Sequence, residues 1–241
     1  MTNNHLSYAT LSGPKLRAFL QGYITCDLDE LQPGIAMPMA ITEIKGRVVA
    51  NGWVFEKDDC LVLVLHLSVV DIVHKHLLPY MRFARCEISV EDLPIYISSD
   101  ATNVPTKLVV HGQEFGFTSQ KTRAHDLDAF QIETGYALVT AATSGKFLPQ
   151  MLNLTDFDSV SFSKGCYLGQ EVVARAQHRG AVKRRLFLSA HELRDVAIGD
   201  QVKTQHGDKA VVVASGANAA LVVLATSADD NDLRLIAEPD S

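Results

Sequence analysis

The run from Lys164 to Glu171, Lys-Gly-Cys-Tyr-Leu-Gly-Gln-Glu, constrains the local fold more than any other segment of this chain. Apolar side chains recur after it at helical spacing, which predicts a helix over roughly residues 168–177. Gly165 and Gly169 allow the backbone to turn sharply just before that helix. The run therefore predicts a turn that holds Cys166 at the N-terminal end of a helix.

Cys166 is the chemically most informative residue of this turn. The unpaired amides of the first helical turn and the positive end of the helix dipole favour a negative charge there. Such a thiol ionises more readily than a free one, which favours nucleophilic, redox or metal-ligating chemistry. We predict Cys166 and the neighbouring Lys164 as catalytic residues. The alternative is a buried thiol that fills the turn, because free cysteine is often buried.

The segments around this turn closely resemble one protein family, over residues 132–135, 147–154, 161–175 and 179–184. The family is YgfZ: bacterial folate-binding proteins related to mitochondrial iron–sulfur assembly factors and, more distantly, to the glycine-cleavage aminomethyltransferase. Its signature is Lys-Gly-Cys-Tyr-x-Gly-Gln-Glu, and residues 164–171 match every fixed position. A weaker match covers residues 19–22, Thr25, Asp27 and residues 45–47.

The resemblance implies an α+β fold. It predicts an aminomethyltransferase-like, folate-binding core of interleaved α/β subdomains in a ring, followed by a small C-terminal antiparallel β-barrel. We expect residues 1–185 to form the folate-binding region and residues 186–241 the barrel. Short strands are predicted at 186–190, 200–204, 209–215, 219–226 and 233–237, and regular short strands by themselves suggest such a barrel.

Hydrophobic periodicity predicts the elements of the first region. We expect a short helix between Pro14 and Gly22, a helix over 68–80 that Pro79 ends, and a helix near 124–133. The predicted strands are 35–42, 47–56, 60–67, 87–93, 95–98 and 107–111, with a polar loop over 98–106.

The resemblance also implies which residues hold tetrahydrofolate or a one-carbon derivative of it. Glu133 lies in the Ile-Glu-Thr-Gly segment, whose counterpart in aminomethyltransferases contributes to the folate pocket. A carboxylate there accepts two hydrogen bonds from the pterin edge; the alternative is a solvated glutamate at a helix end. Gln150 and Asn153 are expected to add amide contacts, and Tyr167 and Phe147 aromatic faces, unless these rings are plain core.

Two features of this chain depart from the family pattern near the ligand. Some members use tryptophans there, whereas this chain has Leu6 and Leu127 at the matching positions and its single tryptophan, Trp53, elsewhere. Aminomethyltransferases carry an acidic pair where this chain has Ala50-Asn51. Neither residue can act as a general base, which argues against glycine-cleavage activity. Asp27 lies after a short helix and is predicted to brace a turn.

Charge is unevenly distributed along the chain. The net charge of −6 argues against a general nucleic-acid binder. Basic side chains nevertheless gather in one short segment: Arg175, His178, Arg179, Lys183, Arg184 and Arg185. An anion such as a folate polyglutamate tail or a tRNA phosphate stretch would suit this cluster, and Arg175 is a predicted cofactor contact. The alternative is a solvated surface with carboxylate partners.

The remaining composition favours a cytoplasmic protein. The four cysteines show no paired spacing, so neither disulfides nor a metal site is predicted. No apolar run reaches the ~18 residues that span a bilayer, and the first residues lack the pattern of a signal peptide.

Three functional hypotheses follow. The first is a folate-binding accessory protein that maintains or repairs iron–sulfur enzymes, including those that methylthiolate tRNA. Its partners would be client enzymes or assembly proteins, and it would act on tRNA only indirectly. The second is a folate-dependent one-carbon transferase with Cys166 as nucleophile. The third is a tRNA-binding module in which the basic cluster holds phosphates.

Overall fold

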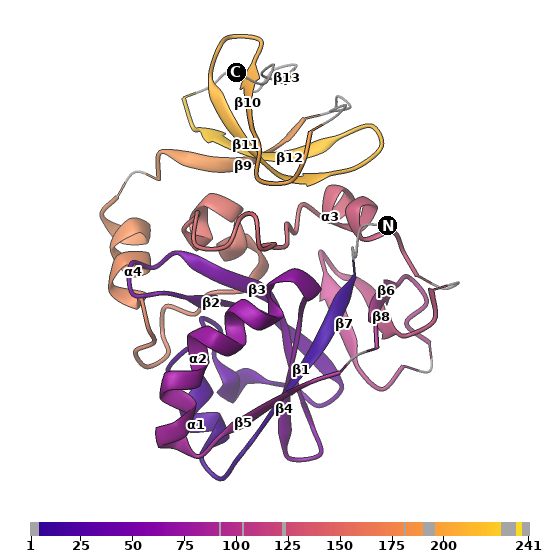
Figure 1. Cartoon of the computed structure of the whole chain (residues 1–241), viewed down its shortest axis with the longest axis vertical. Coiled ribbons are helices and arrows are strands. Elements are labelled where there is room, and N and C mark those ends of the chain that lie inside the picture. Colours follow the sequence, from indigo (N-terminus) through magenta and orange to yellow (C-terminus); the bar gives the residue numbers. More distant parts are fainter. Residues whose placement is uncertain are drawn as a thin grey trace.

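Two β-sheets, with helices around and between them, make up the computed structural model (Figure 1). The structure describes residues 5–91, 93–102, 104–121, 124–180, 182–189, 196–227 and 235–237. In the larger sheet the strands run in the order β5-β1-β4-β3-β2-β7-β8-β6, and in the smaller β13-β10-β11-β12-β9.

The larger sheet contains β1 (Leu6–Ser12), β2 (Ile35–Thr42), β3 (Val48–Lys57), β4 (Cys60–His66), β5 (Glu87–Val90), β6 (Tyr96–Ser98), β7 (Lys107–Val110) and β8 (Gln113–Thr118). The smaller sheet contains β9 (Arg184–Ser189), β10 (Gln201–Thr204), β11 (Lys209–Ser215), β12 (Ala220–Ala225) and β13 (Leu235–Ala237). The α-helices are α1 (Leu16–Gln21), α2 (Val70–Ala84), α3 (Leu127–Thr134) and α4 (Gln170–His178). Short 3₁₀ helices are η1 (Leu28–Glu30), η2 (Leu67–Val69), η4 (Pro149–Leu152) and η5 (Leu154–Phe157).

The larger sheet is curled. Its pairings are antiparallel except for β2 with β7, which run parallel. Leu6 at the start of β1 exchanges both backbone hydrogen bonds with Ile95 just before β6, at 2.9 Å each. This contact brings the β6 end of the sheet back to β1, the second strand from the opposite end. It also places β1 beside the segment that leads into α3.

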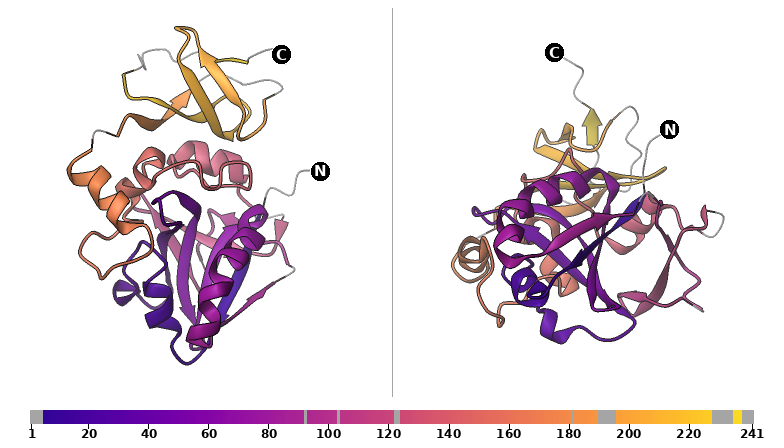
Figure 2. Two further views of the ribbon diagram at one scale, coloured as in Figure 1. Left: turned by 60° about the vertical axis from the view of Figure 1, so that its left-hand side comes forward. Right: turned by 60° about the horizontal axis from the view of Figure 1, so that its bottom comes forward.

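The smaller sheet lies across α3 and η4 (Figure 2, left). Alternate residues of its strands face two different cores, as expected for a sheet covered on both faces. Val213, Leu221 and Val223 belong to the main core, whereas Val212 and Val222 belong to a small core of their own. Within the described residues β9 and β13 form the two edges, so the strands make an open antiparallel sheet there.

The α+β fold class predicted from the sequence is confirmed. Each strand expected from residue 186 onward is present to within two residues at either end. The strands of the second sheet therefore lie where the sequence predicts short strands, although β9 already begins at Arg184 and the described strands form an open sheet rather than a closed barrel.

Three details of the first region differ from the sequence prediction. Strand β1 was not predicted, although it pairs with β4 from Leu6 to Leu11. The helix expected to end at Pro79 continues to Ala84. Pro79 is exposed and Met81 buried, so water can satisfy the carbonyl that the proline leaves unpaired while the apolar face continues. Strand β8 was not predicted, although it forms a hairpin with β7 through His111 and Gly112, which both have positive φ. Two such residues are typical of a tight β-turn.

Candidate functional site

Lys164 holds the Cys166 loop against the end of α1. Its Nζ donates hydrogen bonds to the carbonyl oxygens of Gln21, Ile24 and Cys26, at 2.8, 2.8 and 2.7 Å. These three bonds use all three N–H groups of the ammonium. Burial lowers the pKa of Lys164, while the nearby Cys26 thiol and carboxylates act in the opposite direction. The geometry thus gives Lys164 a structural contact, not a proton-transfer contact with Cys166.

Tyr167 lies beneath the same ammonium. The Lys164 Nζ is 5.5 Å from the centroid of the Tyr167 ring, and only 5% of Tyr167 is exposed. A cation over an aromatic face at this distance is attractive. Burial raises the pKa of the Tyr167 hydroxyl, so it stays neutral at physiological pH. Tyr167 therefore packs inside the loop, and its ring does not line any of the cavities described below.

The end of the loop is fixed to α1 and to the β2–β3 hairpin. The Leu168 N–H donates to the Gly22 carbonyl at 2.9 Å, and the Thr42 hydroxyl donates to the Leu168 carbonyl at 2.5 Å. Gly169 has φ +87°, and a Cβ there would lie 2.4 Å from the Glu43 carbonyl oxygen. Only glycine fits both this backbone conformation and this close approach. The second glycine of the motif is required by the fold.

Cys166 is left exposed by this arrangement. Its neighbours in the motif at positions 164, 167 and 169 contact the rest of the protein, whereas the Cys166 side chain points out of the fold and is not buried within it. The structure therefore contradicts the alternative in which this thiol fills the turn. Cys26 is the buried counterpart, and burial raises its pKa to about 12. A thiol of that kind is unreactive at neutral pH.

A second group of predicted residues lies along α3, where two adjoining cavities are both lined by Asp126. We call these two cavities together the groove along α3. One cavity, of about 210 Å³, is lined by Leu6 and Leu127, the two positions matched to tryptophans of the family. The other, of about 450 Å³, lies between α3 and the β11–β12 turn and is lined by Glu133. The larger cavity has the size typical of small-molecule sites, ~300–1,000 Å³.

Glu133 is available to a ligand. Its side chain is 63% exposed, and its Oε2 lies 3.2 Å from Nε2 of His125, which also lines the smaller cavity. Asp126 begins α3 as its N-cap, accepting a hydrogen bond from the Ala129 N–H at 2.9 Å. This cap fixes the start of α3 between the two cavities.

Gln150 and Asn153 connect neighbouring elements. The Gln150 side-chain NH₂ donates to the Val173 carbonyl on α4 at 2.9 Å, and that of Asn153 donates to the Leu186 carbonyl on β9 at 3.3 Å. The amide oxygens of both are buried without a partner within the described residues. Both amides thus stabilise the packing of η4, and neither lines the cavities along α3.

The predicted site residues do not form one pocket. Helix α3, which carries Glu133, lies between the two sheets, whereas helix α4, which follows the Cys166 loop and carries Arg175, lies against the β2–β3 hairpin (Figure 1). Arg175 is exposed on α4. The sequence led us to expect a thiol beside a ligand pocket, whereas the structure has these residues in two separate places, a cysteine loop and a groove along α3.

Asn51, which stands at the acidic-pair position of aminomethyltransferases, is fully buried. Its NH₂ donates to the Ala137 carbonyl at 2.9 Å, and its oxygen accepts from the Val139 N–H at 2.7 Å. Both ends of the amide therefore hold β3 to the segment after α3. Trp53, on the same strand, is also fully buried and packs against Tyr136 at 4.9 Å between ring centroids.

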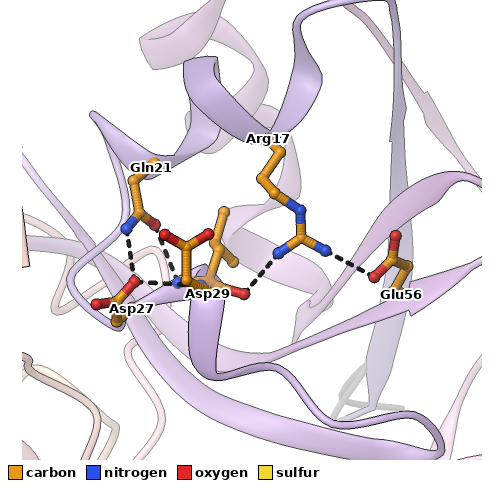
Figure 3. Close-up of polar contacts among 6 residues, drawn as sticks. Arg17, Gln21, Asp27, Asp29 and Glu56 are labelled. Carbon is orange, nitrogen blue, oxygen red and sulfur yellow. Dashed lines mark hydrogen bonds and ion pairs between the residues drawn. The ribbon is translucent and has the colours of Figure 1, made fainter.

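The turn after α1 is braced by Asp27, as the sequence predicts (Figure 3). Its carboxylate accepts from the Gln21 side chain at 2.6 Å and from the Asp29 N–H at 3.1 Å. These hydrogen bonds lower the pKa of Asp27. Arg17 beside it donates to the Leu28 carbonyl and to Glu56, and lines a shallow cavity of about 630 Å³ that sequence analysis did not indicate.

Comparison with known proteins now adds to this geometry. No family model matches the chain. The tRNA-modifying protein YgfZ of Klebsiella pneumoniae (strain 342) is 29% identical over 251 aligned positions, covering 86% of this chain and 76% of that protein. This chain is similar to the YgfZ proteins over most of its length. YgfZ of Sodalis glossinidius (strain morsitans) is likewise 29% identical, over 83% of this chain and 74% of its own.

The fold agrees with the YgfZ relationship. The crystal structure of glycine cleavage system aminomethyltransferase T from Bartonella henselae superimposes with a TM-score of 0.70. The match covers 93% of this chain and 77% of that one at 12% identity, so it establishes the aminomethyltransferase fold alone. Among the described residues no helix has the length and apolar character needed to cross a membrane.

Proposed function

We propose that this protein binds a tetrahydrofolate and supports tRNA modification by maintaining iron–sulfur enzymes, with Cys166 as the key residue. Its YgfZ relatives are named tRNA-modifying proteins, and its fold is that of a folate-dependent aminomethyltransferase. Iron–sulfur client or assembly proteins are then its partners, and tRNA is affected through them. The expected location is the cytoplasm.

The exposed Cys166 is the observation that carries this proposal. The rest of the loop is held by Lys164, Tyr167 and Gly169, so the thiol is presented at a fixed place with open surroundings. A thiol that only filled space would be buried. One thiolate cannot hold a four-iron cluster, which takes about four cysteine ligands, so any cluster contact is transient and shared with the partner.

The groove along α3 is the proposed folate site. Leu6 and Leu127 offer an apolar wall in one cavity, and Glu133 offers an exposed carboxylate in the adjoining one. An apolar face and a carboxylate are the two features that a pterin requires. We place Glu133 as the principal contact. Gln150 and Asn153 support the site indirectly, since their amides hold η4, and Tyr167 and Arg175 lie away from it.

A one-carbon transferase is the weaker alternative. It needs an acid or base near the folate, and Asn51 stands at that position with both ends of its amide bonded to the backbone. The substitution leaves no proton-transfer group there. Cys166 does not replace it, because this thiol is exposed whereas Asn51 is fully buried.

Calorimetric titration with tetrahydrofolate and its one-carbon derivatives tests the folate proposal. We expect micromolar binding. Replacing Glu133 with glutamine should weaken that binding by about 1.5–3 kcal/mol, the contribution of a hydrogen bond to a charged group. The matched control is Glu87→Gln, which removes an exposed carboxylate on β5. No binding of any folate would contradict the proposal, and an unchanged dissociation constant in the Glu133 variant would remove this residue from the site.

A further inference from the structure

The segment from α4 into β9 carries a local excess of positive charge. Between Glu171 and Arg185 there are five arginines and lysines and a single glutamate, on a chain of net charge −6. The basic side chains, which we call the α4–β9 basic surface, are all exposed: Arg175, Arg179, Lys183, Arg184 and Arg185, with His178 among them. Within the part of the chain that the structure describes, none of them forms an ion pair or a side-chain hydrogen bond. The carboxylate partners expected of an ordinary solvated surface are therefore missing from it.

These side chains come from α4, its C-terminal end and the start of β9. Arg175 and His178 are three positions apart on α4 and share a face, and Arg179 ends the helix, its N–H donating to the Arg175 carbonyl at 2.9 Å. The first residues of β9 pair with β12, and the Lys183 carbonyl accepts from the Thr226 N–H at 3.0 Å. Figure 2 (left) shows α4 and the start of β9 on the same side of the molecule. The fold thus fixes the position of the positive charges.

An exposed aromatic ring borders this surface. Phe162, in the loop before Cys166, is 37% exposed. Its ring centroid lies 5.6 Å from that of His178 at the end of α4. The loop is held in place nearby, since the Ser161 N–H donates to the Thr25 carbonyl at 2.9 Å. A basic surface with a fixed, accessible aromatic ring is the arrangement by which proteins bind phosphates and stack unpaired bases.

We propose that the α4–β9 basic surface, with Phe162, binds single-stranded segments of RNA directly. The unneutralised charges select a polyanion, and the ring selects one with accessible bases over a duplex. This inference deepens the proposed role in tRNA modification, because it adds direct contact with the RNA to an effect through client enzymes. It is independent of the groove along α3, whose two cavities are lined by none of these basic residues.

Fluorescence anisotropy with a labelled tRNA transcript tests the proposal, at several salt concentrations and on the full chain. We expect binding at low salt. A plot of the logarithm of the association constant against the logarithm of the salt concentration should have a slope of about −0.7 for each phosphate contact to a single strand. Replacing Arg179, Lys183 and Arg184 together with glutamine should reduce the magnitude of that slope by about 2. The control replaces Lys57, Lys75 and Arg82, three exposed residues elsewhere, with glutamine and should leave the slope unchanged.

Phe162→Ala separates base stacking from charge. It should weaken binding of a single-stranded oligonucleotide by about fivefold or more while leaving the salt slope intact. A blunt RNA duplex of equal length should bind more weakly than the single strand and be insensitive to Phe162→Ala.

Three results would overturn the proposal: no tRNA binding at low salt, equal losses in the test and control triple variants, or no effect of Phe162→Ala on the single strand. Circular dichroism of each variant confirms folding. Folate titration of the same proteins shows separately whether the groove along α3 functions.

Discussion

Lys164 and Cys166 are two positions apart, and their surroundings are opposite. The lysine ammonium is buried among three carbonyl oxygens, while the thiol is exposed. A motif lysine beside a cysteine suggests proton transfer, yet this one joins two distant parts of the chain. The motif therefore contains residues that fix the conformation of the loop, such as Lys164 and Gly169, and one residue, Cys166, that the loop leaves exposed to solvent.

Replacing Lys164 with methionine should destabilise the protein by about 2–4 kcal/mol, because three buried carbonyls lose hydrogen bonds to a charged donor. Urea unfolding measures this loss. The control is Lys45→Met, an exposed lysine of the β2–β3 hairpin, for which we expect a change within about 0.5 kcal/mol. Equal stability of the two variants would show that the three hydrogen bonds contribute nothing.

The role of Lys164 could not be predicted from the sequence. Its acceptors are 138 to 143 positions away in the chain, and backbone carbonyls leave no signature in a sequence. The role of Asp27 could be predicted, because its partners, Gln21 and Asp29, are close in sequence. Contacts between residues close in sequence can be predicted from short sequence patterns. Contacts between distant residues depend on the tertiary fold and cannot be predicted in this way.

At the scale of elements, the contact between the β2–β3 hairpin and the start of α4 fixes the Cys166 loop. Gly169→Ala should cost about 1–2 kcal/mol for the left-handed backbone and a further ~1–3 kcal/mol for the clash with the Glu43 carbonyl. Gly112→Ala is the matched control, since Gly112 has φ +79° and nothing within 4 Å of the added Cβ. Chemical denaturation should show a larger decrease in unfolding free energy for Gly169→Ala than for Gly112→Ala. Equal decreases would show that the clash with the Glu43 carbonyl does not destabilise the variant.

The junction of β4 and α2 should make stability depend on pH. Burial lowers the pKa of His66 to about 4, and its Nδ1 accepts a hydrogen bond from the Ser68 N–H at 3.2 Å. Between about pH 6.5 and pH 4, His66 is therefore protonated in the unfolded chain but neutral in the folded protein. The free energy of unfolding consequently falls as the pH decreases through this range. The loss from this group is on the order of 3 kcal/mol. His66→Asn keeps an acceptor without the titration, so its unfolding free energy should fall less between pH 7 and 5; identical pH profiles would exclude His66 as the cause.

The sequence predicted elements well where apolar periodicity and turn residues agreed, as in the β2–β3 hairpin. It failed at Pro79, where an exposed position lets a helix continue through proline. It also missed β1 and β8. In β8, Phe115 and Phe117 alternate around Gly116 directly after the turn at Gly112, and that alternation beside the predicted strand over 107–111 was the available signal.

At the scale of the whole molecule, the two candidate places lie on different elements. Helix α3 with its groove lies between the two sheets, and the Cys166 loop with α4 lies against the end of α1 and the β2–β3 hairpin (Figure 1). The sequence indicated the residues of both, but their separation follows from strand order, which no motif records. Folate binding and thiol chemistry are therefore expected to fail independently on mutation.

The most direct test of the account is complementation of a strain lacking its YgfZ protein by the Cys166→Ala variant, with methylthiolated tRNA as the readout. We expect the variant to fold and bind folate like the unmodified protein and yet to leave tRNA methylthiolation unrestored. Cys60→Ala, which removes a partly exposed thiol on β4, should complement fully. Restoration of methylthiolation by Cys166→Ala would contradict the central role of this thiol.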